Sequence, residues 1–426
     1  MKFVLSPLRG WSLAFAAAAA LVLAPALIDG SADAQQKRER AQSPRKTPQR
    51  DAKRTPSSEP GGVPDTTARQ ALIVDFQTGA VLYEKNADDR MAPSSMSKMM
   101  TIYMVFKALK EGRLKLDDTL PVSERAWRMQ GSKMFVALGA RVGVEDLIRG
   151  VIVQSGNDAC VVLAEGLAGS EEAFAEQMNV EAKRMGLSAS NFRNSDGWPH
   201  PDHYMTARDL ATLAKHLITD FREHYHYFKE SEFVYGKDQA SGKDIRQGNR
   251  NPLLYKNTGA DGIKTGHADE AGYGLAASAE RQGRRVIMVF NGWPSLKVRA
   301  EESERMLEWS YREFANYTLF KAGDTVDRAD VWLGEKPNVA MVSRNDIVVT
   351  LPRKARPQMK ASVVYEGPVP APVVQGTPIG KLVVTAPGVE TLEAPLVAQA
   401  DVARLGFAGR IAATVGHLIF GSGAKK

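Results

Sequence analysis

The chain has 426 residues, of which 43% are hydrophobic and 25% charged, with a formal net charge of +7 and a single cysteine. This apolar fraction is enough for a large globular core, and one cysteine excludes an internal disulfide, so stability must come from burial. The excess positive charge is concentrated in one segment, residues 36–54, and this location argues against a nucleic-acid-binding surface on the folded part.

The N-terminus has the pattern of a signal peptide. Its features, in chain order, are a basic tip at Lys2 and Arg9, an apolar run from Trp11 to Ile28, and a small-x-small site at Ala32-Asp33-Ala34. We therefore expect residues 1–34 to be removed before Gln35 and the mature protein to be exported to the periplasm. The alternative is a retained membrane anchor, for which the apolar run is short and interrupted by Pro25,.

Residues 35–67 are expected to form a disordered basic linker. Within this range, residues 36–54 contain eight basic side chains against two acidic ones and no aromatic residue. Such a segment cannot bury enough apolar surface to fold. A role in contacting anionic envelope polymers or lipid head groups is the alternative to a simple solvated tether.

A catalytic domain is expected over residues 68–318. Apolar runs on both sides of a turn predict a hairpin at 70–84, and helix formers with a single apolar face predict a helix after Pro93 that ends at Gly112,. Helical patterns continue to about Asp220. Strand patterns return at 262–266 and 284–292, and a helix is expected over 303–317. This order of strands, helices and strands predicts an α/β sandwich with a helical insert.

Residues 319–426 are expected to differ in fold class from the catalytic domain. Short alternating runs at 346–352, 360–367 and 381–388, separated by proline and glycine, predict a small all-β domain over 319–400. Residues 401–426 are expected to form an amphipathic tail lying on a membrane surface, because Phe407, Ile411, Val415 and Leu418 share one helical face and Arg410, Thr414 and His417 lie opposite,. The alternative is a terminal helix packed on the β domain.

Three short motifs carry candidate chemistry. They are Ser95-Met-Ser-Lys98, Ser155-Gly-Asn157 and Lys264-Thr265-Gly266. Each is weak alone, since the linker contains another such serine–lysine pair at Ser43 and Lys46. Their positions strengthen the signal, because each falls where its chemistry requires it.

A serine hydroxyl needs a neighbouring base to become a nucleophile. Residues three apart share a helix face, so Lys98 can reach Ser95, and the free backbone N–H of Ser95 at a helix start can help to hold an oxyanion. A lysine acts as a base only when burial or another cation favours its neutral form, and Lys264 supplies a second charge. The alternative for an isolated motif is a capping serine followed by a surface lysine.

The other two motifs suit substrate handling. Ser155 can relay a proton, while the Asn157 amide offers a donor and an acceptor to a substrate amide. Lys264 and Thr265 present charge and a hydroxyl to a carboxylate beside Gly266 on a strand edge. The structural alternatives are a plain helix cap at Ser155 and an ordinary edge strand with a protective lysine.

Together these motifs resemble those of the penicillin-recognising serine enzymes. The blocks at 134–160, 249–254 and 261–285 are similar to the D-alanyl-D-alanine carboxypeptidases, the low-molecular-mass penicillin-binding proteins of the penicillin-binding protein 5 type. The resemblance implies a β-lactamase/transpeptidase-like fold with an antiparallel sheet and a small C-terminal β domain. It also implies peptidoglycan stem peptides as substrates, β-lactams as covalent inhibitors, and no cofactor.

Roles follow from the same resemblance. Ser95 would be acylated, Lys98 would act as base, and Ser155 with Asn157 would move the proton and position substrate. Lys264 and Thr265 would bind the terminal carboxylate, His267 would give a second oxyanion N–H from its backbone, and Arg299 would be a further carboxylate ligand. An exposed helical arginine is the alternative for Arg299.

Rival functions stay open at this point. They are a D-Ala-D-Ala endopeptidase, a β-lactamase, and a wall-binding scaffold without turnover. No Glu-x-x-Leu-Asn element follows Asn157 to supply a lactamase deacylation base, and the intact motif set disfavours a scaffold. The histidines lack an HExxH pattern and a cysteine partner, so we expect no metal site.

Overall fold

The computed structural model describes residues 62–237 and 241–420. The predicted signal peptide, most of the predicted linker and the last six residues of the tail lie outside the described residues. Thr66 and Thr67, at the end of the predicted linker, donate their hydroxyls to Glu302 at 2.6 and 3.0 Å. The end of the linker that the sequence predicts to be disordered is therefore held in place by Glu302.

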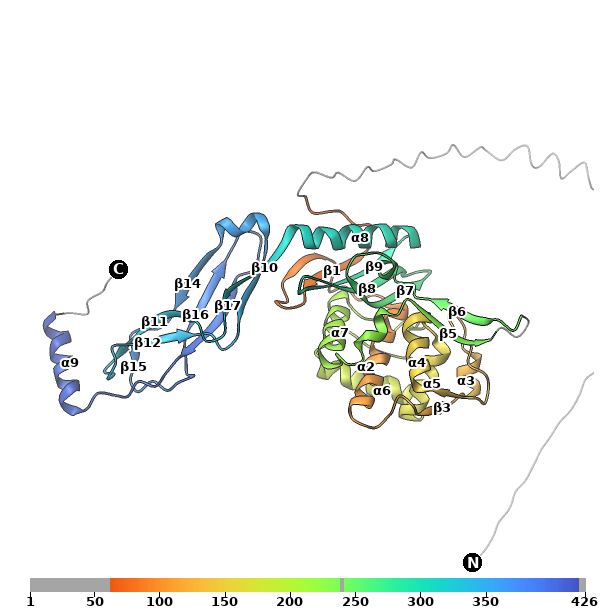
Figure 1. The fold of residues 1–426 in the computed structure, drawn as a ribbon, viewed down its shortest axis with the longest axis horizontal. Coiled ribbons are helices and arrows are strands. Elements are labelled where there is room, and N and C mark those ends of the chain that lie inside the picture. The colour runs from red at the N-terminus through yellow and green to blue at the C-terminus, as the bar shows by residue number, and fades with distance from the viewer. Residues whose placement is uncertain (1–61, 238–240, 421–426) are drawn as a thin grey trace, which may run out of the picture. The chain divides into compact units, whose positions relative to one another are not determined.

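A five-stranded antiparallel sheet forms the centre of the α/β domain (Figure 1), with the strand order β2-β1-β9-β8-β7. Its strands are β1 (Gln70–Asp75), β2 (Val81–Lys85), β7 (Ala260–Ala268), β8 (Gly272–Arg281) and β9 (Arg284–Trp293). β1 pairs with β9, so the first and last parts of the domain lie side by side. This confirms the predicted sandwich, in which the helical segments are inserted between the first and last strands.

Alternation along β9 explains how the sheet is covered on both faces. Ile287 and Val289 pack into the core formed with the helical block, whereas Met288 and Phe290 pack against the opposite core. The helices of the block are α2 (Lys98–Lys110), α3 (Glu124–Arg128), α4 (Val144–Arg149), α5 (Asn157–Ala168), α6 (Glu171–Arg184) and α7 (Ala207–Asp220). Two ribbons accompany them, β3 (Thr119–Pro121) with β4 (Arg141–Gly143) and β5 (Glu232–Lys237) with β6 (Asp244–Gly248).

The opposite face is covered by α8 (Leu296–Glu313), which supplies Met306, Leu307 and Trp309 to that core. The helix differs from the predicted 303–317 at both ends. Ser295 caps it by accepting the Val298 N–H at 3.2 Å, and the chain continues from Phe314 as a strand. The earlier start matters because it places Arg299 in the first turns of a helix.

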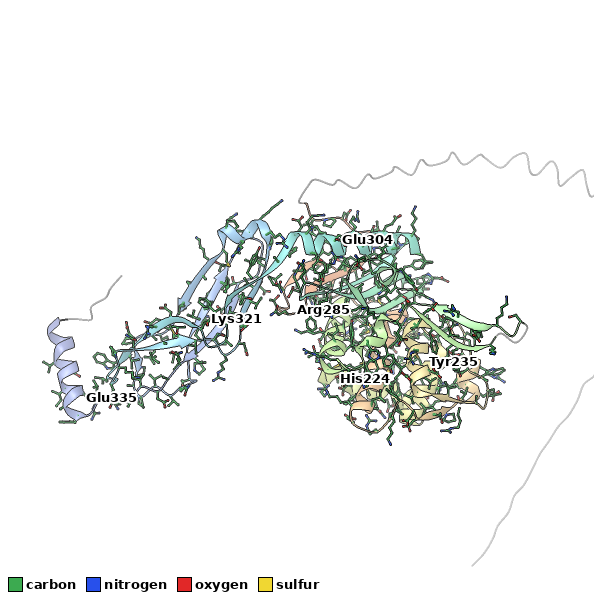
Figure 2. All side chains as sticks on the ribbon, in the orientation of Figure 1. His224, Tyr235, Arg285, Glu304, Lys321 and Glu335 are labelled. Atoms are coloured by element: carbon green, nitrogen blue, oxygen red, sulfur yellow. The ribbon has the colours of Figure 1, made fainter. Side chains whose placement is uncertain are left out.

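The second domain is all-β. Its strands are β10 (Phe314–Phe320), β11 (Thr325–Trp332), β12 (Asn338–Val342), β13 (Ile347–Pro352), β14 (Lys360–Val364), β15 (Val369–Pro370), β16 (Pro378–Thr385) and β17 (Leu392–Ala398). Six of them form a sheet in the order β14-β16-β17-β12-β11-β15, and β10 pairs with β13. Figure 2 labels Lys321 and Glu335 in this domain, and His224 and Tyr235 in the α/β domain. The predicted class of both domains is confirmed.

The tail contains helix α9 (Phe407–Phe420). Phe407, Ile411 and Val415, which the sequence places on one face, are 74%, 51% and 47% exposed. Among the described residues, no helix is both long and apolar enough to cross a bilayer.

Candidate active site

Ser95 and Lys98 meet where two helical segments join. Ser95 lies in a short 3-10 turn, Ser94–Ser97, and α2 begins directly afterwards at Lys98. Lys98 Nζ donates to Ser95 Oγ at 2.9 Å and to the carbonyl oxygen of Asp196 at 2.5 Å. Lys98 is fully buried, and Ser95 is partly exposed. Because a carbonyl oxygen can only accept, a neutral Lys98 keeps an N–H on Asp196 and is free to turn its lone pair toward Ser95 Oγ.

Ser155 and Lys264 form a second pair. Lys264 Nζ donates to Ser155 Oγ at 2.9 Å and to the Thr265 carbonyl oxygen at 3.3 Å. Burial, followed by the charge of Lys98, holds the pKa of Lys264 well below its usual range,. Ser155 has a φ of 67°, in the left-handed region. A non-glycine residue is strained in that region, and such strain is concentrated at functional sites.

Asn157 is held by hydrogen bonds to the loop that contains Gln130 and Ser132. Its backbone N–H donates to the Ser132 carbonyl and its side-chain Nδ2 to the Gln130 carbonyl, both at 2.7 Å. The next residue, Asp158, is fully buried. Its carboxylate accepts the backbone N–H groups of Met134, Phe135 and Val136 at 2.9, 2.9 and 3.2 Å. The start of α5 therefore fixes this loop beside Ser155.

A cleft of about 660 Å³ opens over these groups. The predicted residues that line it are Ser95, Ser155, Asn157, Thr265, Gly266, His267 and Arg299. Lys98 and Lys264 lie directly behind this wall, hydrogen-bonded to the two serines. The structure thus brings every predicted site residue together, although Lys264 faces Ser155 rather than the cleft.

Gly266 lets the edge strand β7 approach the nucleophile. A Cβ atom at this position would lie 2.9 Å from the Pro93 carbonyl oxygen and 3.2 Å from Met96, so a larger residue would push the strand away. The next residue, His267, stacks its ring on Tyr273 with 4.0 Å between centroids. This packing fixes the backbone of β7 next to Ser95.

Two arginines supply positive charge to the cleft. Arg299 is 5% exposed and donates through Nη2 to the Arg250 carbonyl oxygen at 3.0 Å. Burial and the neighbouring Arg250 lower the pKa of Arg299 to about 10. Arg250, whose pKa burial also lowers, donates to Ser132 Oγ at 2.6 Å. Both remain cations at neutral pH and suit an anionic group in the cleft.

The cleft wall also contains residues that sequence reasoning missed, among them Asp196, Trp198, Arg250 and Tyr273. Arg250 lies in the block at 249–254, and the similarity of this block to the carboxypeptidases could have marked it as a site residue. Asp196 and Trp198 lie in an irregular loop and Tyr273 is the second residue of β8, where no periodic pattern marks them.

His203 and Ser97 form a buried pair near the nucleophile, with Ser97 Oγ 2.7 Å from Nε2. The other ring nitrogen, Nδ1, accepts the Arg193 backbone N–H at 3.3 Å. In the neutral ring Nε2 therefore carries the proton and donates to Ser97. His203 cannot act as a base toward Ser97 in this tautomer. Within residues 62–237 and 241–420, no group of three or more histidine, cysteine and acidic side chains is placed to hold a metal ion.

Comparison with known proteins gives matches over both domains. A family model described as D-alanyl-D-alanine carboxypeptidase, of peptidase family S11, matches residues 54–293, and one described as penicillin-binding protein 5, C-terminal domain, matches residues 314–404. The chain is 39% identical to D-alanyl-D-alanine carboxypeptidase DacC of Escherichia coli K12, over 82% of this chain and 87% of that protein.

Solved structures show the same relationship. The chain resembles penicillin binding protein 5 from Haemophilus influenzae with a TM-score of 0.73 and 37% identity, over 80% of this chain and 99% of that one. It also resembles penicillin-binding protein D2 from Listeria monocytogenes in an ampicillin-bound form, with a TM-score of 0.52 and 29% identity, over 58% of this chain and 98% of that one.

Proposed function

Since the chain belongs to the D-alanyl-D-alanine carboxypeptidase family, we propose that it removes the terminal D-alanine from peptidoglycan stem pentapeptides through an acyl-enzyme at Ser95. The observation that carries this proposal is the 2.9 Å contact between Ser95 Oγ and the buried amine of Lys98, on the wall of a cleft that also presents two arginines.

In the first step, Ser95 Oγ attacks the carbonyl carbon of the terminal D-Ala–D-Ala bond and transfers its proton to Lys98 Nζ. The backbone N–H groups of Ser95 and His267 receive the negative charge that develops on the carbonyl oxygen. The leaving amine then takes a proton through Ser155, which Lys264 orients from behind. Water subsequently hydrolyses the ester and releases the shortened peptide.

Substrate orientation comes from the ends of the cleft. Thr265 and Arg299 bind the terminal carboxylate, with Arg250 adding charge, and Asn157 binds the substrate amide. Lys264 does not contact this carboxylate directly, because it is 4% exposed and faces Ser155.

Mass spectrometry of the purified protein with a synthetic pentapeptide ending in D-Ala-D-Ala tests the proposal. We expect the loss of one D-alanine from the peptide, and no loss with Ser95→Ala. Cleavage of crosslinked dimers alone would instead identify an endopeptidase, and absence of turnover with both substrates would identify a scaffold.

Penicillin is expected to form a long-lived adduct at Ser95, because a β-lactam mimics the acyl-D-Ala-D-Ala amide. Glu171, the buried acid of α6, is already bound by Ser195 and by Arg125 at 2.5 to 3.0 Å, so it is not available as a deacylation base. Peptide mapping after labelling should place the adduct on Ser95. A label on Ser155, or turnover within seconds, would contradict this assignment.

We also propose that the mature enzyme is periplasmic and peripheral on the outer leaflet of the inner membrane. The signal-peptide pattern supports export, and the exposed Phe407, Ile411 and Val415 of α9 support contact with lipid,.

A further inference from the structure

The segment 194–198 supplies Asp196, Gly197 and Trp198 to the wall of the cleft and is fixed from several sides. Ser195 donates its backbone N–H and its hydroxyl to the Glu171 carboxylate at 3.0 and 2.7 Å. Its carbonyl oxygen accepts the Thr101 hydroxyl from α2. The Gly197 N–H donates to Asn194 Oδ1 at 2.8 Å. These bonds join α2 and α6 to the segment, so its position is set by the helical core.

Gly197 brings the segment against the nucleophile's turn. It has a φ of +80°, and a Cβ atom there would lie 2.0 Å from the Ser94 carbonyl oxygen. Only glycine allows this approach. The neighbouring Asp196 is thereby held next to Lys98, whose amine donates to the Asp196 carbonyl oxygen at 2.5 Å.

The Asp196 side chain has no structural task that uses both of its oxygens. It is 1% exposed, and Oδ1 accepts the Trp198 N–H at 2.9 Å. Oδ2 is buried and has no partner among the described residues. Burial raises the pKa of this carboxyl group, and the charge of Lys98 opposes that rise. A buried carboxylate with an uncommitted oxygen is costly unless a cation compensates it.

The other titratable groups near Lys98 show which of them can compensate the positive charge of its ammonium form. Lys264 is a second amine, whose pKa is held low by burial and by Lys98. Burial raises the pKa of the Cys160 thiol, and burial followed by the nearby His200 and Lys98 charges lowers the pKa of His203 to about 4, so both groups are neutral at pH 7.

Glu171 also lies nearby, but its charge is matched by Arg125 at 2.5 Å. Among the described residues, Asp196 is therefore the acid near Lys98 whose charge has no other partner.

We propose that Asp196 is a positioning residue, whose carboxylate stabilises the Lys98 ammonium that forms when Ser95 loses its proton. In this step the Ser95 Oγ–H bond breaks, the Oγ–carbon bond to the acyl group forms, and the proton moves to Lys98 Nζ. Asp196 exchanges no bond. This inference rests on the proposed function, because it assumes that Lys98 is the base for Ser95.

If Asp196 acts through its charge, its removal changes the pH profile of acylation, which the loss of a purely structural residue would not do. Without the carboxylate, the Lys98 ammonium loses a counter-charge in a poorly solvated site and still faces Lys264. Acylation then slows. The amine also loses its proton more readily in the free enzyme, so the acidic limb of the acylation profile, which reports the base, moves to lower pH.

The test is the second-order rate of acylation by a fluorescent penicillin, measured between pH 4.5 and 9 for the wild type, Asp196→Asn and Asp196→Ala. The alanine variant covers the case in which the asparagine amide disturbs Lys98. We expect a roughly tenfold fall in the maximal rate and a shift of the acidic limb by about one pH unit downward. Asp202→Asn, which changes an exposed acid of the same loop, is the matched control and should reproduce the wild-type profile.

Thermal unfolding confirms that each variant is folded before its profile is interpreted. A limb that stays in place, or moves to higher pH, in folded variants would overturn the inference, even if the rate falls. Failure of the wild type itself to be labelled at Ser95 would overturn the proposed function instead, so the two failures are distinguishable.

Discussion

Lys98 is equipped to act as a base because of its surroundings rather than its residue type. It is fully buried, hydrogen-bonded to Ser95, and close to a second amine. Lys98→Ala should therefore lower the rate of penicillin acylation by several orders of magnitude, as the loss of a nucleophile's base does, while the protein stays folded. Stopped-flow labelling and circular dichroism measure the two effects.

Lys110→Ala, at the exposed end of the same helix, is the control for the Lys98 variant and should acylate at the wild-type rate. Unchanged acylation in the Lys98 variant at neutral pH would show that another group takes the proton.

The lowered pKa of His203 predicts that the stability of the protein depends on pH. Burial, the first cause, and the nearby His200 and Lys98 lower its pKa from 6.5 to about 4. Between these values the unfolded chain binds a proton that the folded protein excludes, so stability is lost as pH falls from 6.5 toward 4. The loss approaches about 3 kcal/mol at the acidic end.

Urea unfolding at pH 4.5 and 7 should show a smaller difference for His203→Gln than for the wild type, because glutamine keeps a donor for Ser97 without titrating. An equal difference in the two proteins would assign the pH dependence to other groups. His226 is exposed and provides the control, since His226→Gln should leave the stability difference between pH 4.5 and pH 7 unchanged.

Helix α5 organises the cleft through its first turn. The Asp158 carboxylate accepts backbone N–H groups from residues 134–136, and this loop in turn holds Asn157. Asp158→Asn replaces an acceptor with an N–H₂ group, so at least one buried donor loses its partner. We expect a loss of about 2 to 3 kcal/mol in the free energy of unfolding and a higher KM for the pentapeptide.

Denaturant titration and steady-state kinetics check both effects of Asp158→Asn. Asp117→Asn, at an exposed loop position, should change neither. A variant with normal KM would show that Asn157 is positioned without the loop.

Elements with a regular pattern were predictable from the sequence, and turns were not. The helix after Pro93, the helix at Asn157 and the strands around Lys264 follow from apolar periodicity and glycine placement. The segment 194–198 has no such period, because its conformation depends on Glu171 and Thr101 from distant helices. For the same reason, Asp196 could not be assigned to the site before the fold was known.

The whole-chain order of strands, helices and strands was enough to predict the α/β sandwich, since the first and last strands must pair to close one sheet. The boundary between the domains was harder. The expected helix over 303–317 includes Phe314 to Tyr317, which form the start of β10 and pair with β13. Phe314 and Tyr317 favour strand as aromatic residues, and only the pairing with a segment more than 30 residues later resolves the ambiguity,.

The tail gives the last prediction. Phe407, Ile411 and Val415 expose apolar side chains on α9, and the sequence adds Lys425 and Lys426 beyond the described residues. An exposed apolar face flanked by basic residues suits the interface of an anionic bilayer. Arg404, which the sequence places on the apolar side of this helix, precedes α9 and pairs with Gly334 of the β domain, so it is not part of the apolar face.

Truncation after Leu405, which keeps the residues 402–405 that pair with the β domain, should therefore leave penicillin labelling and pentapeptide hydrolysis unchanged, because the active-site residues lie in the α/β domain. The truncated enzyme should stay in the supernatant when vesicles containing anionic lipid are sedimented, whereas the full mature chain should sediment with them. Replacing Phe407 and Ile411 with serine in the full chain separates the apolar contribution from that of the lysines, and should weaken sedimentation at constant charge. If the truncated protein unfolds, or still sediments with vesicles, the tail is a packed terminal helix, and attachment to the membrane must come from another part of the chain.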